Sequence, residues 1–333
     1  MRTHTIPIVW CVDVEPDATV PTAGERRWTG FDDMVDTVAR VRPALEARTG
    51  APVRVAWFLR MDPMVSDIYG RADHVVEEHA ECFDRLATAG DPIGLHVHPY
   101  RFDPERAVWY SDHTDLDWAQ HCITTAGASF TATFGRAPTT LRMGGYYLPS
   151  AVVDALVEQG VRVDLTAEPG RGPMSKDTSH GAFATEPSTD FRPFPRQRYR
   201  PSTADPSIPA TNAADARALT LVPLTAYDTR SHLLPRYRAV ARRVVRRGVR
   251  YEPLNPWRTW PSPQWFWDCA TKAAKQVGGD HLAFATRTLA ASDPNAANQE
   301  HVLEGLVDHP LVTRLRFVDP LDLELDPDGA SAA

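Results

Sequence analysis

Two apolar segments of the chain end in pairs of side chains that can bind a metal ion or transfer protons. The run IPIVWCV is followed by Asp13 and Glu15, and the later run PIGL is followed by His96 and His98. Side chains of a β-strand alternate between its faces, so residues i and i+2 point the same way. Each pair therefore shares one face at the end of a predicted strand. Carboxylates and imidazoles directed at one point would form a metal site or an acid–base site.

Each pair alone also has an ordinary structural explanation. A D-x-E at a strand end is often a cap or an ion pair, and a lone H-x-H beside Pro99 need not bind a ligand. The two pairs together, on separate α/β units, favour a metal site. Imidazole with carboxylate suits a divalent ion, with Zn²⁺ as the first choice and Co²⁺, Ni²⁺ or Mn²⁺ as alternatives. Catalytic sites of this type keep an open position for water, whose pKa the metal lowers.

The elements that must position these pairs follow from the alternation of short apolar runs with amphipathic segments, which is typical of βα units around a parallel sheet. Strands are predicted at 6–14, 53–60, 92–97, 138–143, 161–165, 218–223, 281–287 and 313–318. Helices are predicted where apolar residues recur at i, i+3 and i+4, over 31–45, 75–86 and 152–157. The last two end at Gly90 and Gly160, which can adopt the left-handed cap conformation.

Seven or eight such units suit a (β/α) barrel, regular or distorted, better than a short open sheet. In either architecture, functional groups gather at the carboxyl ends of the strands. The acidic pair, the histidine pair and Arg142 all sit at predicted strand ends. The strand predictions did not use these residues, so the agreement supports a common site.

Two segments depart from this pattern. Residues 167–217 are rich in Pro, Ser, Thr, Asp and Arg, and we expect an irregular insertion that could cap the site. The stretch 251–261, which includes Trp257, leads into Trp265 and Trp267. These tryptophans either pack against the barrel or form exposed platforms that stack on sugar rings. We expect one catalytic barrel over 1–325 and a flexible tail over 326–333.

Composition narrows the class of protein. The 333 residues carry a formal charge of −7, with 43% hydrophobic and 24% charged residues, which is ordinary for a soluble globular protein. The negative charge argues against a nucleic-acid partner. No apolar stretch is long enough to span a membrane, and we expect a cytoplasmic protein with no membrane partner. The four cysteines are scattered without C-x-x-C spacing, so we expect buried thiols in a reducing compartment. The oligomeric state stays open.

Three motifs carry a family resemblance: VDVEPD at 12–17, GLHVHP at 94–99 and LRMGGY at 141–146. On these motifs the chain resembles the polysaccharide deacetylase (NodB-homology) family of carbohydrate esterases, and most of all its branch with D-x-E and H-x-H-P. The segment LVPLT at 221–225 is similar to a later strand of the family. The resemblance extends over residues 6–320 and implies a single domain with a distorted (β/α)7-type barrel.

The resemblance also implies a role for each matching residue. Asp13 would be the general base that takes a proton from metal-bound water. The metal ligands would be Glu15, His96 and His98. Arg142 would pair with Asp13 and keep it ionised, since a nearby cation lowers a carboxylate pKa. The backbone at 144–146 would stabilise a tetrahedral oxyanion, and we assign Tyr146 and Trp257 to substrate binding.

Two departures from the family pattern affect these roles. Family members usually carry H-x-x-x-H, and here Tyr100 stands four positions after His96, so either His98 fills the ligand site or the metal geometry is altered. A late strand of the family usually carries a His that protonates the leaving amine. Arg287 stands at that position, and a guanidinium cannot donate a proton near pH 7, so we assign Arg287 to substrate binding. The candidates for the missing acid are His113, His232 and His281, with His232 the first to test.

Three functions from different classes stay open. The first is a metal-dependent hydrolase that removes an N-acetyl, less often an O-acetyl, group from an intracellular acetamido sugar, glycoside or sugar-containing biosynthetic intermediate. The second is a catalytically weakened homologue that binds carbohydrate, which the Arg at position 287 motivates. The third is another metal-dependent amide hydrolysis, such as an amidase or allantoinase-like activity. Each implies a small carbohydrate or glycosylated small molecule, or a related amide, as partner.

Overall fold

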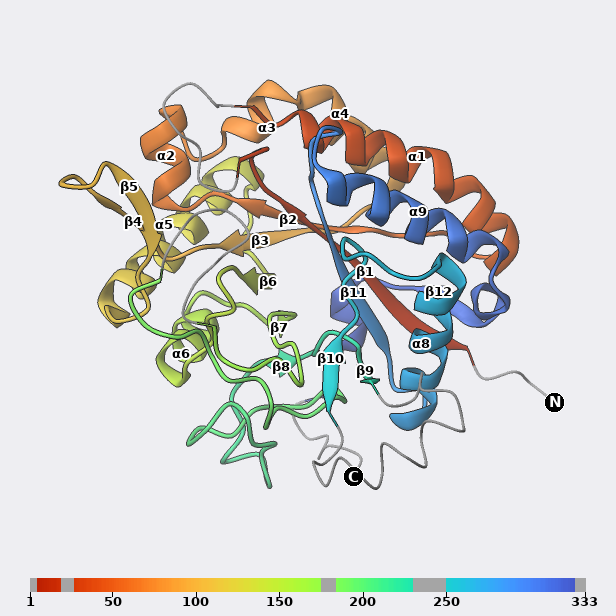
Figure 1. Ribbon diagram of the computed structural model, residues 1–333. Helices are drawn as coiled ribbons and strands as arrows, with labels where there is room; N and C mark the ends of the chain where they lie inside the picture. Colours follow the sequence, from red (N-terminus) through yellow and green to blue (C-terminus); the bar gives the residue numbers. More distant parts are fainter. Residues whose placement is uncertain (1–4, 19–26, 175–183, 230–249, 327–333) are drawn as a thin grey trace.

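Strand β1 (Ile6–Val14) lies inside an eight-stranded parallel sheet that curls into a distorted (β/α) barrel (Figure 1). The computed structural model describes residues 5–18, 27–174, 184–229 and 250–326. The strand order is β11-β1-β2-β3-β6-β7-β8, and β12 pairs with the beginning of β1. Every strand predicted from the sequence is present, and the predicted fold class is confirmed.

The other strands of this sheet are β2 (Ala56–Arg60), β3 (Ile93–Val97), β6 (Thr140–Met143), β7 (Val163–Asp164), β8 (Thr220–Leu221), β11 (Leu282–Arg287) and β12 (Leu315–Phe317). Their register places polar strand ends at one level. Asp13 is opposite Arg287 of β11, and His96 lies between Arg60 of β2 and Arg142 of β6. These side chains therefore belong to one edge of the sheet, as the sequence predicted.

No strand ladder joins the two edge strands β8 and β11 in the described part of the chain. Thr225, shortly after β8, bridges the opening. Its backbone N–H donates to the carbonyl oxygen of Ala283 at 2.8 Å, and its hydroxyl accepts from the Ala283 N–H at 2.9 Å. The barrel is thus closed by single hydrogen bonds rather than by a ladder, which makes it a distorted barrel.

Helices surround the sheet, and Figure 1 shows α1 and α9 side by side on one flank of it. The helices are α1 (Thr29–Thr49), α2 (Pro63–Tyr69), α3 (His74–Glu78), α4 (Ala80–Ala89), α5 (Leu116–Phe134), α6 (Ser150–Glu158), α8 (Pro263–Gln276) and α9 (Pro294–Asp308), with short 3₁₀ turns η2 (Pro310–Arg314) and η3 (Pro320–Leu323). Two antiparallel strand pairs lie outside the sheet and were not predicted: β4 (Tyr100–Asp103) with β5 (Val108–Ser111), and β9 (Ala226–Asp228) with β10 (Tyr251–Pro253).

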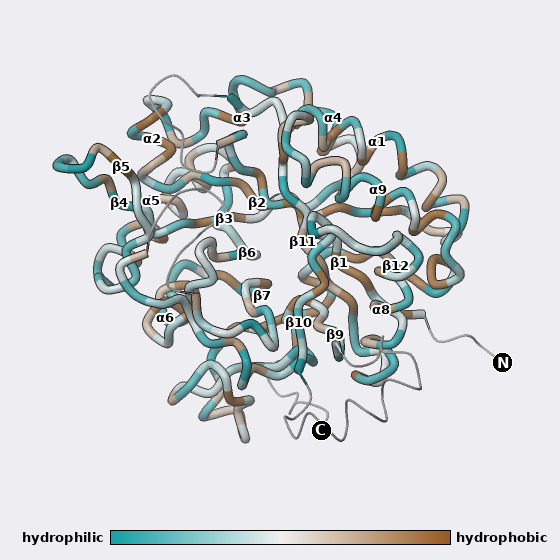
Figure 2. The backbone as a smooth tube through the Cα atoms, in the orientation of Figure 1, coloured by the Kyte–Doolittle hydropathy of each residue, from teal (hydrophilic) through white to brown (hydrophobic). Residues whose placement is uncertain are grey.

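The two largest hydrophobic cores among the described residues lie on opposite faces of the sheet, and Figure 2 shows hydrophobic residues along the central strands β1 and β2. The larger core lies between sheet and helices and contains Trp10 and Val12 of β1. The smaller core fills the barrel interior and contains Val9 and Cys11. Because strand side chains alternate, Asp13 continues the inward row of Val9 and Cys11. The side chains of β1 that face the barrel interior are thus apolar at Val9 and Cys11 and acidic at Asp13, where the strand ends.

The boundaries differ from the sequence prediction in two places. Strand β2 begins at Ala56 rather than at residue 53, because the N–H groups of Val53 and Val55 donate to the side chains of Glu46 and Asp91 and not to a strand. The helix predicted over 75–86 is divided into α3 and α4. The break lies at His79, whose ring bonds Asp32 of α1 at 2.8 Å, a tertiary contact that overrides the local periodicity.

The irregular insertion packs onto the barrel where the structure describes it. Phe191 and Tyr199 are buried, and Tyr199 forms an antiparallel bridge with Leu221. The tryptophans of the Trp-rich stretch differ in their surroundings. Trp267 is buried and donates to the Val302 carbonyl at 2.8 Å, whereas Trp257 lines a cavity at the carboxyl edge of the sheet.

Some predictions fall outside the described residues: His232, part of the insertion (175–183), and the proposed tail beyond residue 326. The four cysteines are free and buried, as expected. Within the described ranges, no helix is both long and apolar enough to cross a membrane.

The barrel interior depends on Gly94. Gly94 faces inward on β3, and a Cβ there would lie 2.4 Å from Thr140 Oγ1 and 2.8 Å from the ring of Phe58. We predict that Gly94→Ala lowers the free energy of unfolding by about 1–3 kcal/mol, the usual cost of overpacking. Urea unfolding measures this, with Gly172→Ala as control, because a Cβ at Gly172 meets no atom closer than 3.8 Å. Equal stability of the two variants would contradict the packing account.

Candidate metal centre

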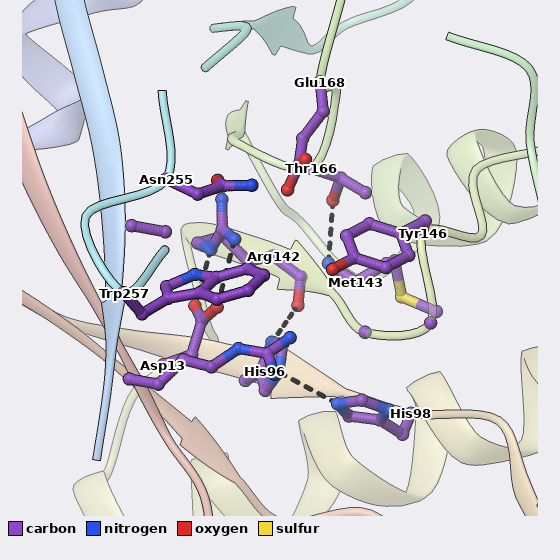
Figure 3. Close-up of a pocket in the computed structure, with 14 residues that line it drawn as sticks. Asp13, His96, His98, Arg142, Met143, Tyr146, Thr166, Glu168, Asn255 and Trp257 are labelled. Atoms are coloured by element: carbon purple, nitrogen blue, oxygen red, sulfur yellow. Dashed lines mark hydrogen bonds and ion pairs between the residues drawn. The ribbon is translucent and has the colours of Figure 1, made fainter. Parts of the chain in front are cut away.

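Four strands deliver polar side chains to one cavity at the carboxyl edge of the sheet (Figure 3). Asp13 comes from β1, His96 and His98 from the end of β3, Arg142 from β6 and Arg287 from β11. The cavity is also lined by Tyr146, Thr166, Glu168, Asn255 and Trp257. The structure thus brings together most of the predicted site residues that it describes: Asp13, Glu15, His96, His98, Arg142, Tyr146, Trp257 and Arg287.

Glu15, His96 and His98 form a compact cluster of metal-ligating atoms, and each residue is 3% exposed. Glu15 Oε1 lies 3.0 Å from His96 Nε2 and 2.8 Å from His98 Nε2. The two imidazole Nε2 atoms are 3.0 Å apart. Three atoms that can each offer a lone pair thus converge on one point.

Proton positions show why this cluster fits a cation. His96 Nδ1 lies 2.8 Å from the carbonyl oxygen of Arg142, which can only accept, so Nδ1 carries the proton. In the neutral ring, Nε2 is then a bare acceptor facing the Glu15 carboxylate, which is also an acceptor. Acceptors at this separation repel each other unless a cation or a proton lies between them. Imidazole nitrogens and one carboxylate are the donor set that Zn²⁺ and related divalent ions prefer.

The charge states favour ligand behaviour as well. Burial alone would raise the pKa of Glu15, but opposing interactions, led by the Arg287 guanidinium, lower it well below its ordinary value, so Glu15 is a carboxylate. Burial and then the Arg60 guanidinium lower the pKa of His98 to about 4, so its ring is neutral at pH 7. Metal binding requires deprotonated ligands, and both groups are already in that state.

His98 is held by packing rather than by a second hydrogen bond. Its ring stacks on Tyr100 at 4.7 Å between centroids and 6° between planes, and its Nδ1 has no hydrogen-bond partner in the described part of the chain. On the other side lies Gly144, where a Cβ would come within 2.1 Å of the imidazole. Tyr100, four positions after His96, thus orients His98 in this chain.

Asp13 and Arg142 form a buried bidentate ion pair beside the cluster. Arg142 Nε and Nη2 donate to the two Asp13 oxygens at 2.6 and 3.1 Å, and Arg142 also donates to the carbonyl of Leu165. Burial would raise the pKa of Asp13, but Arg142 and then His96 outweigh it and lower the pKa. Asp13 is therefore an ionised carboxylate at the cavity, in a position to accept a proton.

A second buried ion pair, Arg60 with Asp62, lies behind the cluster and was missed by the sequence analysis. Arg60 donates to both Asp62 oxygens at 2.7 and 2.9 Å, and Asp62 accepts the backbone N–H of His98 at 3.3 Å. The pair fixes the end of β3, where His98 lies. Its signal was in the sequence, because Arg60 ends β2 and Asp62 comes two residues later, the i, i+2 spacing that identified the other pairs.

The cavity walls contain further residues that carry no sequence signal. Glu168 accepts from Arg171 at 2.6 Å, and the Arg171 guanidinium lies 4.1 Å from the ring centroid of Tyr146. Asn255 lies on the loop after β10. Tyr146 has a φ of 55°, uncommon for a residue with a side chain, and follows Gly145 with a φ of 66°.

The structure also places two of the three histidines proposed as substitute acids. His281 is at the start of β11, at the far end of that strand from Arg287, and its ring bonds Asp280 and the Pro223 carbonyl. His113 stacks on Tyr147, and its Nε2 would lie 3.2 Å from a Cβ at Gly145. Neither lines the cavity.

Comparisons with known proteins bear on the fold. No family model matches the chain, and no curated protein matches it. A structure from Parabacteroides distasonis, provisionally assigned as a glycoside hydrolase/deacetylase, is similar at 13% identity and TM-score 0.53, over 92% of this chain and 67% of that chain. A provisionally assigned polysaccharide deacetylase from Mycobacterium smegmatis shares 12% identity over 94% of this chain and 86% of its own, with TM-score 0.48. A family 4 carbohydrate esterase from Streptomyces lividans, in complex with acetate, shares 6% identity over 97% and 96%, with TM-score 0.40. The first of these shows a common barrel fold.

Gly144 provides a test of the metal centre. A methyl group at this position would displace the His98 ring, so we predict that Gly144→Ala weakens Zn²⁺ binding by at least about tenfold, and that His98→Ala weakens it at least as much. Calorimetric titration of Zn²⁺ into metal-free protein measures this. His121→Ala, an exposed histidine on α5, is the matched control. Unchanged Zn²⁺ affinity in both site variants, with folding intact by circular dichroism, would contradict the assignment.

Proposed function

We propose that the protein is a metal-dependent hydrolase that removes an acetyl group from the nitrogen of a small acetamido sugar or a sugar-containing intermediate, with Zn²⁺ as the first choice of ion. One observation carries the proposal: an ionised, arginine-paired carboxylate, Asp13, lies in the same cavity as a Glu–His–His cluster. A metal cluster and an adjacent base are what hydrolysis of an unactivated amide requires. The motif resemblance and the barrel fold support the same conclusion.

Glu15, His96 and His98 would hold a divalent ion, which would supply a Lewis acid and lower the pKa of a nearby water molecule. Asp13 would accept a proton from water, because its pairing with Arg142 keeps it ionised. Arg142 has a second role. Both oxygens of Asp13 are bound by one guanidinium, so the carboxylate has a fixed orientation toward the cavity.

The turn at 144–146 is our candidate for stabilising the oxyanion of the tetrahedral intermediate. Two successive residues with positive φ, Gly145 and Tyr146, turn the backbone at the cavity wall. The carbonyl of Tyr146 accepts the N–H of Thr189 at 3.0 Å, which anchors the turn to the insertion. A strained conformation held by its surroundings is common where backbone groups act on a substrate.

The leaving amine needs a proton that Arg287 cannot give. After taking a proton from water, Asp13 is a neutral carboxylic acid. We propose that this acid donates the same proton to the leaving amine. His232 stays a predicted alternative for this step. The position of Arg287 also motivates the second candidate function, a protein that binds a carbohydrate without hydrolysing it.

Acetate release from metal-loaded protein separates the two functions. We predict acetate from at least one of a panel of acetamido sugars and their glycosides. Asp13→Asn should retain the metal and lose activity by about 10²-fold or more, because it loses the base. Asp84→Asn, an exposed aspartate on α4, is the control. Full activity in Asp13→Asn would contradict the role of Asp13, and sugar binding without acetate release would support the second function.

A further inference from the structure

One wall of the cavity, formed by Asn255, Trp257 and Arg287, presents hydrogen-bond donors; we call it the donor wall. Asn255 is 1% exposed, and its amide nitrogen has no hydrogen-bond partner in the described ranges. Figure 3 shows this nitrogen directed into the cavity. A buried donor without a partner costs about 1–3 kcal/mol, so this amide needs an acceptor that the described residues do not supply, such as a ligand or a bound water.

Arg287 is held firmly at this wall. Its guanidinium carbon lies 5.2 Å from the ring centroid of Trp257, two residues after Asn255. Its backbone is fixed by Gln299, which accepts the Arg287 N–H and donates to the Arg287 carbonyl, both at 2.8 Å. A guanidinium is always charged and only donates, and its fork matches carboxylate and phosphate oxygens. The donor wall is therefore suited to an acceptor with negative charge.

The other side of the cavity is different. In Figure 3, Tyr146 lies across the cavity from Trp257. Beside Tyr146, the Arg171 guanidinium is bound to Glu168 at 2.6 Å. Glu168 is therefore a hydrogen-bond acceptor whose negative charge is balanced by Arg171. The side of the cavity formed by Glu168 and Tyr146 thus suits the hydroxyl groups of a sugar.

The charges of the cavity lead to the same conclusion. Among the described residues of the cavity, its metal cluster and Arg171, the carboxylates are Asp13, Glu15 and Glu168, and the guanidiniums are Arg142, Arg171 and Arg287. These six charges cancel. A divalent ion at the Glu–His–His cluster then leaves an excess of positive charge in a buried site, where it is poorly screened. A neutral acetamido sugar does not balance this charge, whereas a substrate with an anionic group does.

We propose that the donor wall binds a carboxylate or phosphate group of the substrate, so that the substrate is an anionic N-acetylated amino sugar. This inference rests on the proposed deacetylase function. The donor wall adjoins Asp13 directly, because β1 pairs with β11 and places Asp13 opposite Arg287. The anionic group is therefore on the same sugar unit as the acetamido group, not on a distant part of a polymer.

Binding to the metal-free full chain tests this inference without turnover. The neutral probe is N-acetylglucosamine. The anionic probes are N-acetylglucosamine 6-phosphate, which carries a phosphate, and N-acetylmuramic acid, which carries a carboxylate. We expect at least one anionic probe to bind about tenfold or more tightly than the neutral one by calorimetry, the effect of a charge-assisted pair. The probe that gains affinity identifies the group. Equal binding, or absence of binding, of all three probes would overturn the inference.

Variants assign the effect to the donor wall. Arg287→Gln should remove the preference for the anionic probe, while Arg316→Gln, an exposed arginine on β12, should keep it. Asn255→Asp places a negative acceptor at the wall and should weaken anionic binding more than Asn255→Ala does. If the preference survives Arg287→Gln, the inference is wrong.

Acetate release from the same three probes by metal-loaded protein separates this inference from the proposed function. Release from neutral and anionic probes at equal kcat/KM would overturn the anionic substrate and leave the deacetylase intact. Arg287-dependent anion binding with no release from any of the three would support the donor wall and count against the deacetylase.

Discussion

The site depends on one constraint: three lone-pair donors, from Glu15, His96 and His98, converge within 3.0 Å of one another in a buried position. Without a cation or a shared proton this arrangement is repulsive, so the rest of the fold must hold it in place. Strand alternation supplies the direction, since both pairs lie at i and i+2 on parallel strands. The close packing of Gly144 and Tyr100 against the His98 ring supplies the rigidity.

Ion pairs between buried carboxylates and arginines, next to the apolar barrel interior, determine the chemistry of the site. The interior residues below the cavity are apolar, so charges above them are poorly screened and must be compensated. Asp13 is compensated by Arg142, and Asp62 by Arg60. The same low polarity that would raise the pKa of an isolated Asp13 makes the Arg142 contact strong enough to lower it. An ionised base and the metal-ligating cluster can thus lie next to each other in the same cavity.

Sequence reasoning predicted the parallel barrel and its strand order along the chain because hydrophobic periodicity records burial directly. It also brought Asp13, Glu15 and both histidines to one edge, because spacing on a strand determines direction. Arg60 and Asp62 follow the same rule and were overlooked. Asn255 could not be found in this way, because it lies on an irregular segment where spacing carries no information about direction. The positions of Glu168 and Arg171 could not be predicted for the same reason, because both lie at the start of the irregular insertion. The break between α3 and α4 at His79 could not be predicted because it comes from a tertiary contact with Asp32.

The most direct test of the central claim is anomalous diffraction from crystals grown with Zn²⁺, recorded at the zinc absorption edge. The account predicts one strong peak about 2.0–2.2 Å from a Glu15 carboxylate oxygen and from Nε2 of both His96 and His98. A peak that one of these three side chains does not reach, or a fully ordered cluster with no peak, would contradict it.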